Sequence, residues 1–295
     1  MRMRYISKIQ ANLKRYQVIN TRRATASVLD GSYKSIYKGR SMNFDELREY
    51  IPGDNIKDMD WKASARSRKL LVRDYVAEKK HNVMFIMDTN ARMLADSEGL
   101  EEKRELAIMS AGTLAYFVDR NGDFVSATYG TKRSINHFPL KTGLGNIETI
   151  LESYHNEVTP DNHSEINATL DYIVRNFKRK MILIIVSDME GLLKITNQNL
   201  KRLLVGHDVL MVNISDADIK YNQMYNMNDK EYMDDFFIKD KKLIALAQKN
   251  KADAQRALNQ KLKNFGIPCV TVDYLKELDW ELLNLLSSHK TEIRR

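Results

Sequence analysis

The sequence has few of the residues that mark several classes of protein. Its single cysteine, Cys269, excludes a disulfide-stabilised scaffold and a cysteine-rich zinc site. Four prolines and twelve glycines among 295 residues exclude a collagen-like or linker-dominated chain. The longest uninterrupted apolar run, residues 181–186, is much shorter than the roughly 20 residues of a membrane-spanning helix. The N-terminal segment also lacks the apolar stretch of a secretory signal, so we expect a cytoplasmic protein.

Positive charge is concentrated near the N-terminus. Residues 1–40 contain ten lysines and arginines against one acid, Asp30, and the whole chain has a formal net charge of +8. Such a segment binds nucleic acid or an anionic membrane surface, or it is a solvated helix that pairs with acidic groups. We favour the solvated helix, because no recognisable nucleic-acid-binding motif accompanies the charge. Ile6, Ile9 and Leu13 have the spacing of a short amphipathic helix.

After His81, apolar runs of strand length alternate with segments of helical spacing. The expected strands are 83–87, 123–129, 181–186, 209–214 and 268–272, and the expected helices are 100–118, 146–155, 165–177, 200–205, 241–264 and 280–286. This alternation predicts an α/β fold with a doubly wound, mainly parallel sheet covered on both faces.

The segment before His81 has a different character. It is rich in turn signals, with a small helix expected at 44–50, a turn at Pro52–Gly53 and a strand at 70–76. We therefore expect two parts. Residues 1–80 form a basic N-terminal arm and a small β-rich subdomain, and residues 81–295 form the α/β domain.

Three of the expected strands end in an aspartate, namely Asp88, Asp188 and Asp216. In open parallel sheets ligands bind outside the carboxyl ends of the strands. Carboxylates with neighbouring hydroxyls are ligands that Mg²⁺ or Mn²⁺ prefers. Aspartates at strand ends are also frequent turn formers and helix caps, so each one alone has an ordinary structural explanation. No residue set combines a nucleophile, a base and an orienting group, so we do not expect an enzyme.

A block in the N-terminal part resembles a known family signature. The pattern is a glycine, then Phe-x-Glu-Leu-Arg-x-Tyr, Pro-Gly-Asp, Asp-Trp and Ala-Arg. It occurs here at Gly39, Phe44, Glu46, Leu47, Arg48, Tyr50, Pro52, Gly53, Asp54, Asp60, Trp61, Ala65 and Arg66. This order resembles the signature of domain-of-unknown-function family fifty-eight, whose members resemble von Willebrand factor A domains. The later strands and helices fit the same family, so the resemblance implies a von Willebrand A-like, Rossmann-like fold over nearly the whole chain. Many members carry two membrane helices in front, and this chain resembles the soluble branch.

The signature block also has an interpretation from its residues alone. Charges of alternating sign surround two aromatic residues, Tyr50 and Trp61; they are Glu46, Arg48, Asp54, Asp60 and Arg66. We expect a hydrogen-bonded ion network that packs the small subdomain onto the main sheet. The alternative is a docking surface for a partner.

The resemblance also implies a candidate metal site. A von Willebrand A domain usually has a metal-ion-dependent adhesion site, made by Asp-x-Ser-x-Ser after the first strand, a later Thr and a second Asp. Carried over to this sequence, the ligands of Mg²⁺ or Mn²⁺ would be Asp88, Asn90, Ser164 and Asp188. Arg92 stands where the second serine would be and cannot be a ligand.

Arg92 leaves two arrangements open. It points away from the aspartates, or it takes the metal's place, pairs with Asp88 and Asp188 and leaves donors for a carboxylate of a partner. We therefore expect a degenerate adhesion site. The expected partner-binding residues are Asp88, Arg92, Asp188 and Asp216.

The family resemblance implies a non-enzymatic interaction module. Such a module works beside a MoxR-type AAA+ ATPase in chaperone-like maturation or assembly of a client protein. Two alternatives are a metal-dependent hydrolase or phosphatase that uses the same acids, and nucleic-acid binding by residues 1–40. The tyrosine- and methionine-rich stretch 218–239 is either a partner-binding loop or, as we favour, a loop packed onto the core.

Overall fold

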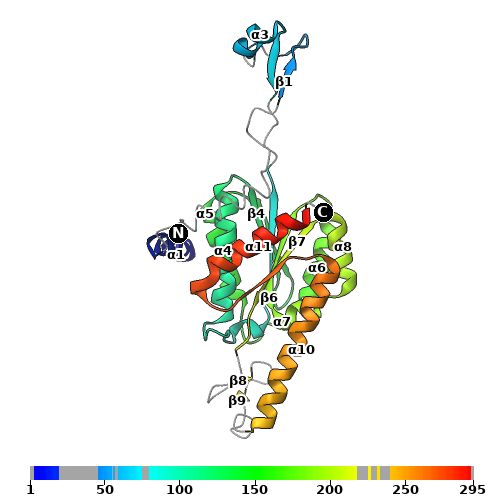
Figure 1. Cartoon of the computed structure of the whole chain (residues 1–295). Coiled ribbons are helices and arrows are strands. Elements are labelled where there is room, and N and C mark those ends of the chain that lie inside the picture. Colours follow the sequence, from blue (N-terminus) through cyan, green and yellow to red (C-terminus); the bar gives the residue numbers. More distant parts are fainter. Residues whose placement is uncertain are drawn as a thin grey trace.

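The computed structural model describes residues 3–19, 46–54, 56, 59–74, 80–217, 225–226, 231–232 and 240–293. These residues form an α/β unit around a six-stranded sheet and a small unit over residues 46–74 (Figure 1). Gly39, Phe44 and most of the 218–239 stretch lie outside the described residues, so their expected roles stay predictions.

The central sheet has the strand order β10-β7-β6-β3-β4-β5. Its strands are β3 (Asn82–Met87), β4 (Phe124–Gly130), β5 (Ile135–Lys141), β6 (Ile182–Asp188), β7 (Asp208–Ile214) and β10 (Cys269–Val272). Five strands run parallel, and β5 pairs antiparallel with β4 at one edge. The predicted doubly wound, mainly parallel α/β fold is thereby confirmed.

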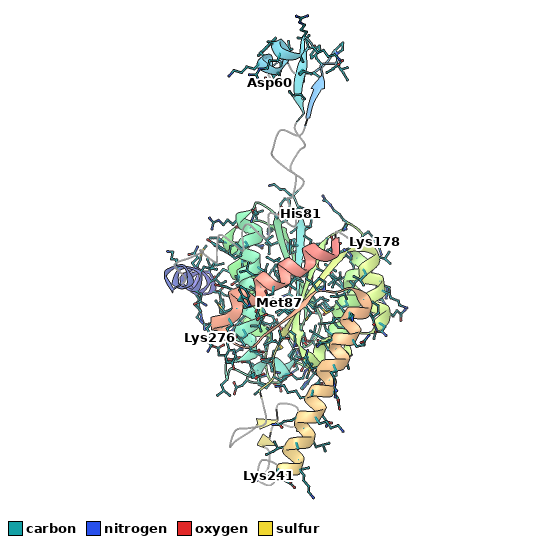
Figure 2. All side chains as sticks on the ribbon, viewed as in Figure 1. Asp60, His81, Met87, Lys178, Lys241 and Lys276 are labelled. Carbon is teal, nitrogen blue, oxygen red and sulfur yellow. The ribbon has the colours of Figure 1, made fainter. Side chains whose placement is uncertain are left out.

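Both faces of the sheet are covered by helices (Figures 1 and 2). One face holds α1 (Arg4–Ile19), α4 (Lys103–Arg120), α5 (Leu144–Glu157) and α11 (Leu278–Ile293), and the other holds α6 (Ile166–Asn176), α7 (Met189–Lys194), α8 (Asn197–Gly206) and α10 (Lys241–Phe265). The side chains of β3 alternate between the two layers, because successive residues of a strand point to opposite faces. Phe85 packs with the first set of helices, and Met84 and Ile86 pack with the second.

Two elements of the α/β unit were not predicted. The edge strand β5 contains Pro139 and is half-exposed along most of its length, so it lacks the continuous apolar run of a buried strand. Helix α7 has six residues and follows Asp188 directly, which is too short to show helical periodicity.

Helix α1 packs into the α/β unit, although the sequence division at residue 80 placed it with the N-terminal segment. Tyr5, Ile6 and Ile9 are fully buried in the core on the α4 and α5 side. The carboxylate of Glu148 on α5, itself fully buried, accepts hydrogen bonds from the backbone N–H groups of Tyr5 and Ile6, both at 2.8 Å. These amides belong to the first turn of α1 and have no partner within their own helix. A residue of the neighbouring helix α5 therefore caps α1. The spacing of apolar residues within α1 could not indicate this cap.

The exposed side of α1 also pairs with the α/β unit. The ammonium group of Lys8 lies 3.0 Å from Glu105 on α4. This is the pairing expected of a solvated basic helix. Residues 20–40, which carry the rest of the basic charge, lie outside the described residues.

The small unit joins β1 (Glu46–Glu49) to β2 (Leu71–Asp74) as an antiparallel pair. The helix expected at 44–50 is wrong for residues 46–49, which form this strand because they pair with a segment 25 residues further along. Gly53 has a φ of 114° at the predicted turn, a conformation that favours glycine.

Helix α3 (Trp61–Ser67) completes the small unit, and the side chain of Asp60 caps it by accepting from the amides of Lys62 and Ala63. Trp61, one of the two aromatic residues around which we expected an ion network, has a side chain that is 61% exposed. Ile51, Ile56 and Leu70 are exposed as well. The described part of the signature block therefore shows surface aromatic and apolar groups where we expected anchors packed on the main sheet.

Replacing Gly112 of α4 by alanine should weaken the docking of α1. An added Cβ would lie 2.5 Å from Cδ1 of Ile9 and 2.9 Å from Cδ1 of Leu151, so these two side chains must move within a packed core. We expect a loss of about 1–3 kcal/mol in the free energy of unfolding, measured by urea denaturation. Gly145→Ala on α5 is the matched control, since nothing lies within 4 Å of its Cβ position. A Gly112→Ala protein as stable as this control would contradict the packing.

Candidate functional site

The strand order brings two of the predicted aspartates together. Strands β3 and β6 are parallel neighbours with Met87 opposite Val186, so Asp88 and Asp188 emerge side by side at their carboxyl ends. Met87, labelled in Figure 2, marks this end of β3. Asp88 is 3% exposed and Asp188 is 1% exposed, so two like charges are buried next to each other.

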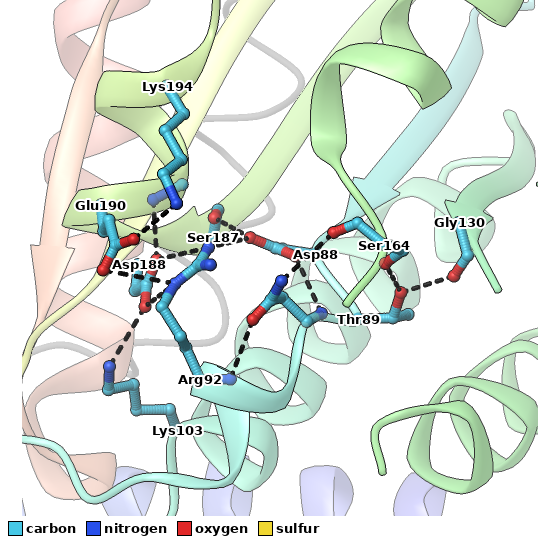
Figure 3. A network of polar contacts seen from close by, with 12 residues as sticks. Asp88, Thr89, Arg92, Lys103, Gly130, Ser164, Ser187, Asp188, Glu190 and Lys194 are labelled. Atoms are coloured by element: carbon cyan, nitrogen blue, oxygen red, sulfur yellow. Dashed lines mark hydrogen bonds and ion pairs between the residues drawn. The ribbon is translucent and has the colours of Figure 1, made fainter. Parts of the chain in front are cut away.

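Arg92 lies between the two carboxylates (Figure 3). It belongs to the short 3-10 turn η2 (Ala91–Leu94), which the side chain of Asn90 caps. Its Nη2 is 3.2 Å from Oδ2 of Asp88 and 3.5 Å from Oδ1 of Asp188, and its Nε is 3.2 Å from Oδ2 of Asp188. Glu190 on α7 adds a longer ion pair at 3.7 Å. Of the two arrangements expected for Arg92, the structure shows the one that pairs with both aspartates.

A second buried cation, Lys103, was missed by the sequence analysis. It is the first residue of α4, and its ammonium group lies 3.2 Å from Oδ2 of Asp188 and also pairs with Asp216. The side chain of Lys103 is 3% exposed. Asp216 is thus connected to Asp188 through this lysine. A lysine at the start of a helix usually faces solvent, so no local signal in the sequence marks it.

Hydrogen bonds hold both aspartates in place. Asp88 accepts from the hydroxyl of Ser187 at 2.6 Å and from the backbone amide of Asn90 at 2.9 Å. Asp188 caps α7 by accepting from the amide of Gly191 at 2.8 Å. Each carboxylate therefore bonds to an amide as well as to a cation, which fixes its orientation.

The surroundings act differently on the two aspartates. Burial alone would raise the pKa of Asp188, but Lys103 and Arg92 outweigh it and lower that pKa below its ordinary value. Burial raises the pKa of Asp88, and the nearby charge of Asp188 raises it further, against the opposing effect of Arg92. Burial likewise disfavours the charged form of Lys103, yet Asp188 and Asp216 raise its pKa. The cations thus stabilise ionised Asp188 most strongly.

The other expected metal ligands are also bonded to the protein. The amide group of Asn90 accepts from the backbone N–H of Arg92 at 3.2 Å and donates to the carbonyl of Ser164 at 3.3 Å. The hydroxyl of Ser164 lies 2.6 Å from that of Thr89, which in turn donates to the carbonyl of Gly130. The structure therefore brings Asp88, Asn90, Ser164 and Asp188 to one place, as predicted, but with their oxygens already paired.

This arrangement does not fit a divalent metal ion. Nowhere in the described part of the chain do three or more His, Cys, Asp or Glu residues form a group that could hold one. A bridging ion between Asp88 and Asp188 would need the place of Arg92 Nη2. At about 4 Å from the guanidinium, an ion would meet a repulsion of roughly 4 kcal/mol per unit of its charge at an effective dielectric constant near 20.

A cleft of about 460 Å³ opens beside Arg92. It is lined by Asn90, Arg92, His163, Ser164, Glu165, Ile166, Asn167, Gly191 and Lys194. Arg92 bonds to the aspartates through Nε and Nη2, and its third nitrogen, Nη1, bonds to none of the described residues. The first turn of α6 reaches the same cleft, and the side chain of Glu165 does not cap it. Hydrogen-bond donors thus border this cleft.

Replacing Lys103 by methionine should destabilise the protein strongly at neutral pH. The change leaves Asp188 and Asp216 buried or half-buried without their shared cation, and breaking a buried pair costs about 3–5 kcal/mol. Asp188 has a lowered pKa in the folded protein, so its contribution to stability is present above the ordinary aspartate pKa of about 4 and is lost at lower pH. The difference from the unsubstituted protein should therefore begin to shrink as the pH falls below about 4, and shrink further as the pH approaches the lowered pKa of Asp188.

Urea unfolding at pH 7 and at pH 3.5 measures this effect. Lys194→Met is the control, because Lys194 forms an exposed pair with Glu190 and its loss should change stability by no more than about 0.5 kcal/mol. Equal effects of the two substitutions at pH 7 would show that Lys103 does not neutralise a buried charge.

Comparison with known proteins assigns the chain to a family. Residues 46–232, more than half of the chain, match the family described as "Protein of unknown function DUF58". Two relatives are the uncharacterized proteins Rv1480 of Mycobacterium tuberculosis (strain H37Rv) and Mb1516 of Mycobacterium bovis, each 24% identical over 191 residues. The match covers 64% of this chain and 60% of the length of each relative.

Several solved structures are similar to this chain at low identity. BatB from Bacteroides thetaiotaomicron has a TM-score of 0.46 at 15% identity, over 72% of this chain and 99% of that protein. The SpRpn10 VWA domain has a TM-score of 0.37 at 9% identity, over 71% of this chain and 94% of that domain. No helix in the described part of the chain has both the length and the apolar character that a membrane crossing requires. The family match confirms the resemblance that the signature block indicates: this chain is a member of the DUF58 family.

Proposed function

We propose that this DUF58 protein is a non-enzymatic interaction module that binds an acidic side chain of a partner protein in the cleft beside Arg92. In this proposal it acts in the cytoplasm with a MoxR-type AAA+ ATPase, in the maturation or assembly of a client protein. The ATPase and the client come from the family resemblance, and the mode of recognition comes from the geometry of the cleft.

The proposal rests mainly on how the guanidinium of Arg92 is bonded. Two aspartates hold its guanidinium rigidly through Nε and Nη2, and Nη1 remains without a partner among the described residues. The uncapped first turn of α6 borders the same cleft and supplies further N–H donors. A carboxylate is a strong acceptor for such donors, because a hydrogen bond between two charged groups is stronger than a neutral one.

Burial of the acids supports a role without catalysis. Ser187 is 0% exposed and is hydrogen-bonded to Asp88, which is 3% exposed and paired with Arg92. A hydrolase or phosphatase that used these groups would have to bring its substrate past the guanidinium. The cleft instead presents Arg92 itself, which binds anions and does not act as a nucleophile or a base.

The signature block supports the same function. We propose the small unit over residues 46–74 as a second contact surface, in place of a scaffold packed on the sheet. Its exposed Ile51, Trp61 and Leu70 favour the docking role. Exposed aromatic groups of this kind are enriched at protein interfaces.

Replacing Arg92 by glutamine should weaken capture of the ATPase. The substitution removes the charge and keeps a side chain of similar length, so a charge-assisted hydrogen bond of about 2 kcal/mol is lost. We expect the amount of companion MoxR-type ATPase that co-purifies with the tagged protein to fall by roughly 30-fold. Lys180→Gln is the control, because Lys180 forms an exposed pair with Asp208 at the opposite end of β6 and β7. A folded Arg92→Gln protein that retains the ATPase as well as this control does would refute the role of the cleft.

A further inference from the structure

We infer that Arg92 and Lys103 together take the place of a divalent metal ion in this crevice, so that binding in the cleft requires no metal. The inference concerns the crevice of the proposed function. It rests on the positions of the two cations and holds whatever partner the cleft receives.

One nitrogen atom of Arg92 fills the position that a bridging metal ion would need. Nη2 of Arg92 contacts both Oδ2 of Asp88 and Oδ1 of Asp188, at 3.2 Å and 3.5 Å. A magnesium ion that joined the same two oxygens would lie about 2.0–2.1 Å from each. It would therefore occupy the space that this nitrogen fills, and one of the two must be absent.

On the side of Gly191, Ser187 and Asp88, away from the cleft, the space beside the guanidinium is also filled. A Cβ at Gly191 would lie 2.0 Å from Oγ of Ser187, 2.5 Å from Oδ2 of Asp88 and 3.2 Å from Nη2 of Arg92. The chain therefore has glycine where it passes closest to this cluster. An ion in addition to Arg92 would find neither room nor free oxygens, since Asn90 and Ser164 are bonded elsewhere.

The charges of Arg92 and Lys103 also match the charge of a divalent metal ion. Arg92 and Lys103 both contact Asp188, from different sides, and Asp88 and Asp216 are bound by one cation each. Together the cations supply two positive charges, the charge of Mg²⁺ or Mn²⁺. Because they are part of the chain, they do not dissociate, and a chelator cannot remove them. The guanidinium also keeps its charge at any ordinary pH.

Removing Arg92 should therefore uncover a metal site. Arg92→Ser restores a hydroxyl at the second serine position of the adhesion-site pattern and frees the carboxylates of Asp88 and Asp188. We would measure thermal unfolding of chelator-treated protein with and without millimolar MnCl₂ or MgCl₂. The unsubstituted protein should show the same midpoint in both conditions. The Arg92→Ser protein should have a lower midpoint in chelator, and Mn²⁺ should raise it by roughly 5 °C or more.

Three further variants make the result specific. Asp88→Asn added to Arg92→Ser should abolish the response to metal, because it removes one of the two bridging carboxylates. Lys194→Ser removes a cation that lines the same cleft but pairs with Glu190, so it should gain no response. Arg92→Gln removes the charge with a smaller change of volume and should gain the response even if Arg92→Ser fails to fold.

Two results would overturn the inference. One is a metal-dependent rise in the midpoint of the unsubstituted protein that Asp88→Asn removes. The other is a folded Arg92→Ser or Arg92→Gln protein that does not respond to Mn²⁺ or Mg²⁺. No partner is present in these measurements, so their outcome is independent of the co-purification experiment.

Discussion

Two buried carboxylates, side by side at the ends of adjacent parallel strands, are the constraint on which the rest of the site depends. Asp88 and Asp188 repel each other and lie almost out of reach of water, so both must be compensated from within the protein. Arg92 and Lys103 provide that compensation from two different elements. The turn after β3 and the start of α4 are consequently tied to the sheet by charge as well as by apolar packing.

The crevice combines a closed side with an open one. On its inner side the carboxylates of Asp88 and Asp188 are bound, and on its outer side Arg92 faces a cleft with one nitrogen that bonds to none of the described residues. A rigid guanidinium loses little conformational freedom when it binds a ligand, because the aspartates have already fixed its orientation. In the proposed function the acids position the arginine, and the arginine is the group that a ligand meets.

The sequence predicted the sheet and the meeting of its strand-end aspartates, because continuous apolar strands and their carboxyl ends follow local rules. It did not predict Lys103, because the burial of a lysine depends on carboxylates that approach from distant strands. The strand Glu46–Glu49 was taken for a helix, since its pairing with β2 is decided by tertiary contact. The exposure of Trp61 likewise cannot be seen in the sequence, because it depends on which surfaces the folded chain packs against that side chain.

The cap of α1 bears on the order in which the chain folds. Its first turn is satisfied by Glu148, which lies 143 residues further along the chain than Tyr5. A ribosome makes roughly 5–20 residues per second, so α1 waits many seconds in an unfolded chain before its cap exists. Helix α1 precedes α4 and α5 in the chain, yet it cannot reach its final position before α5 has been made. Its docking therefore reports that α4 and α5 are already in place.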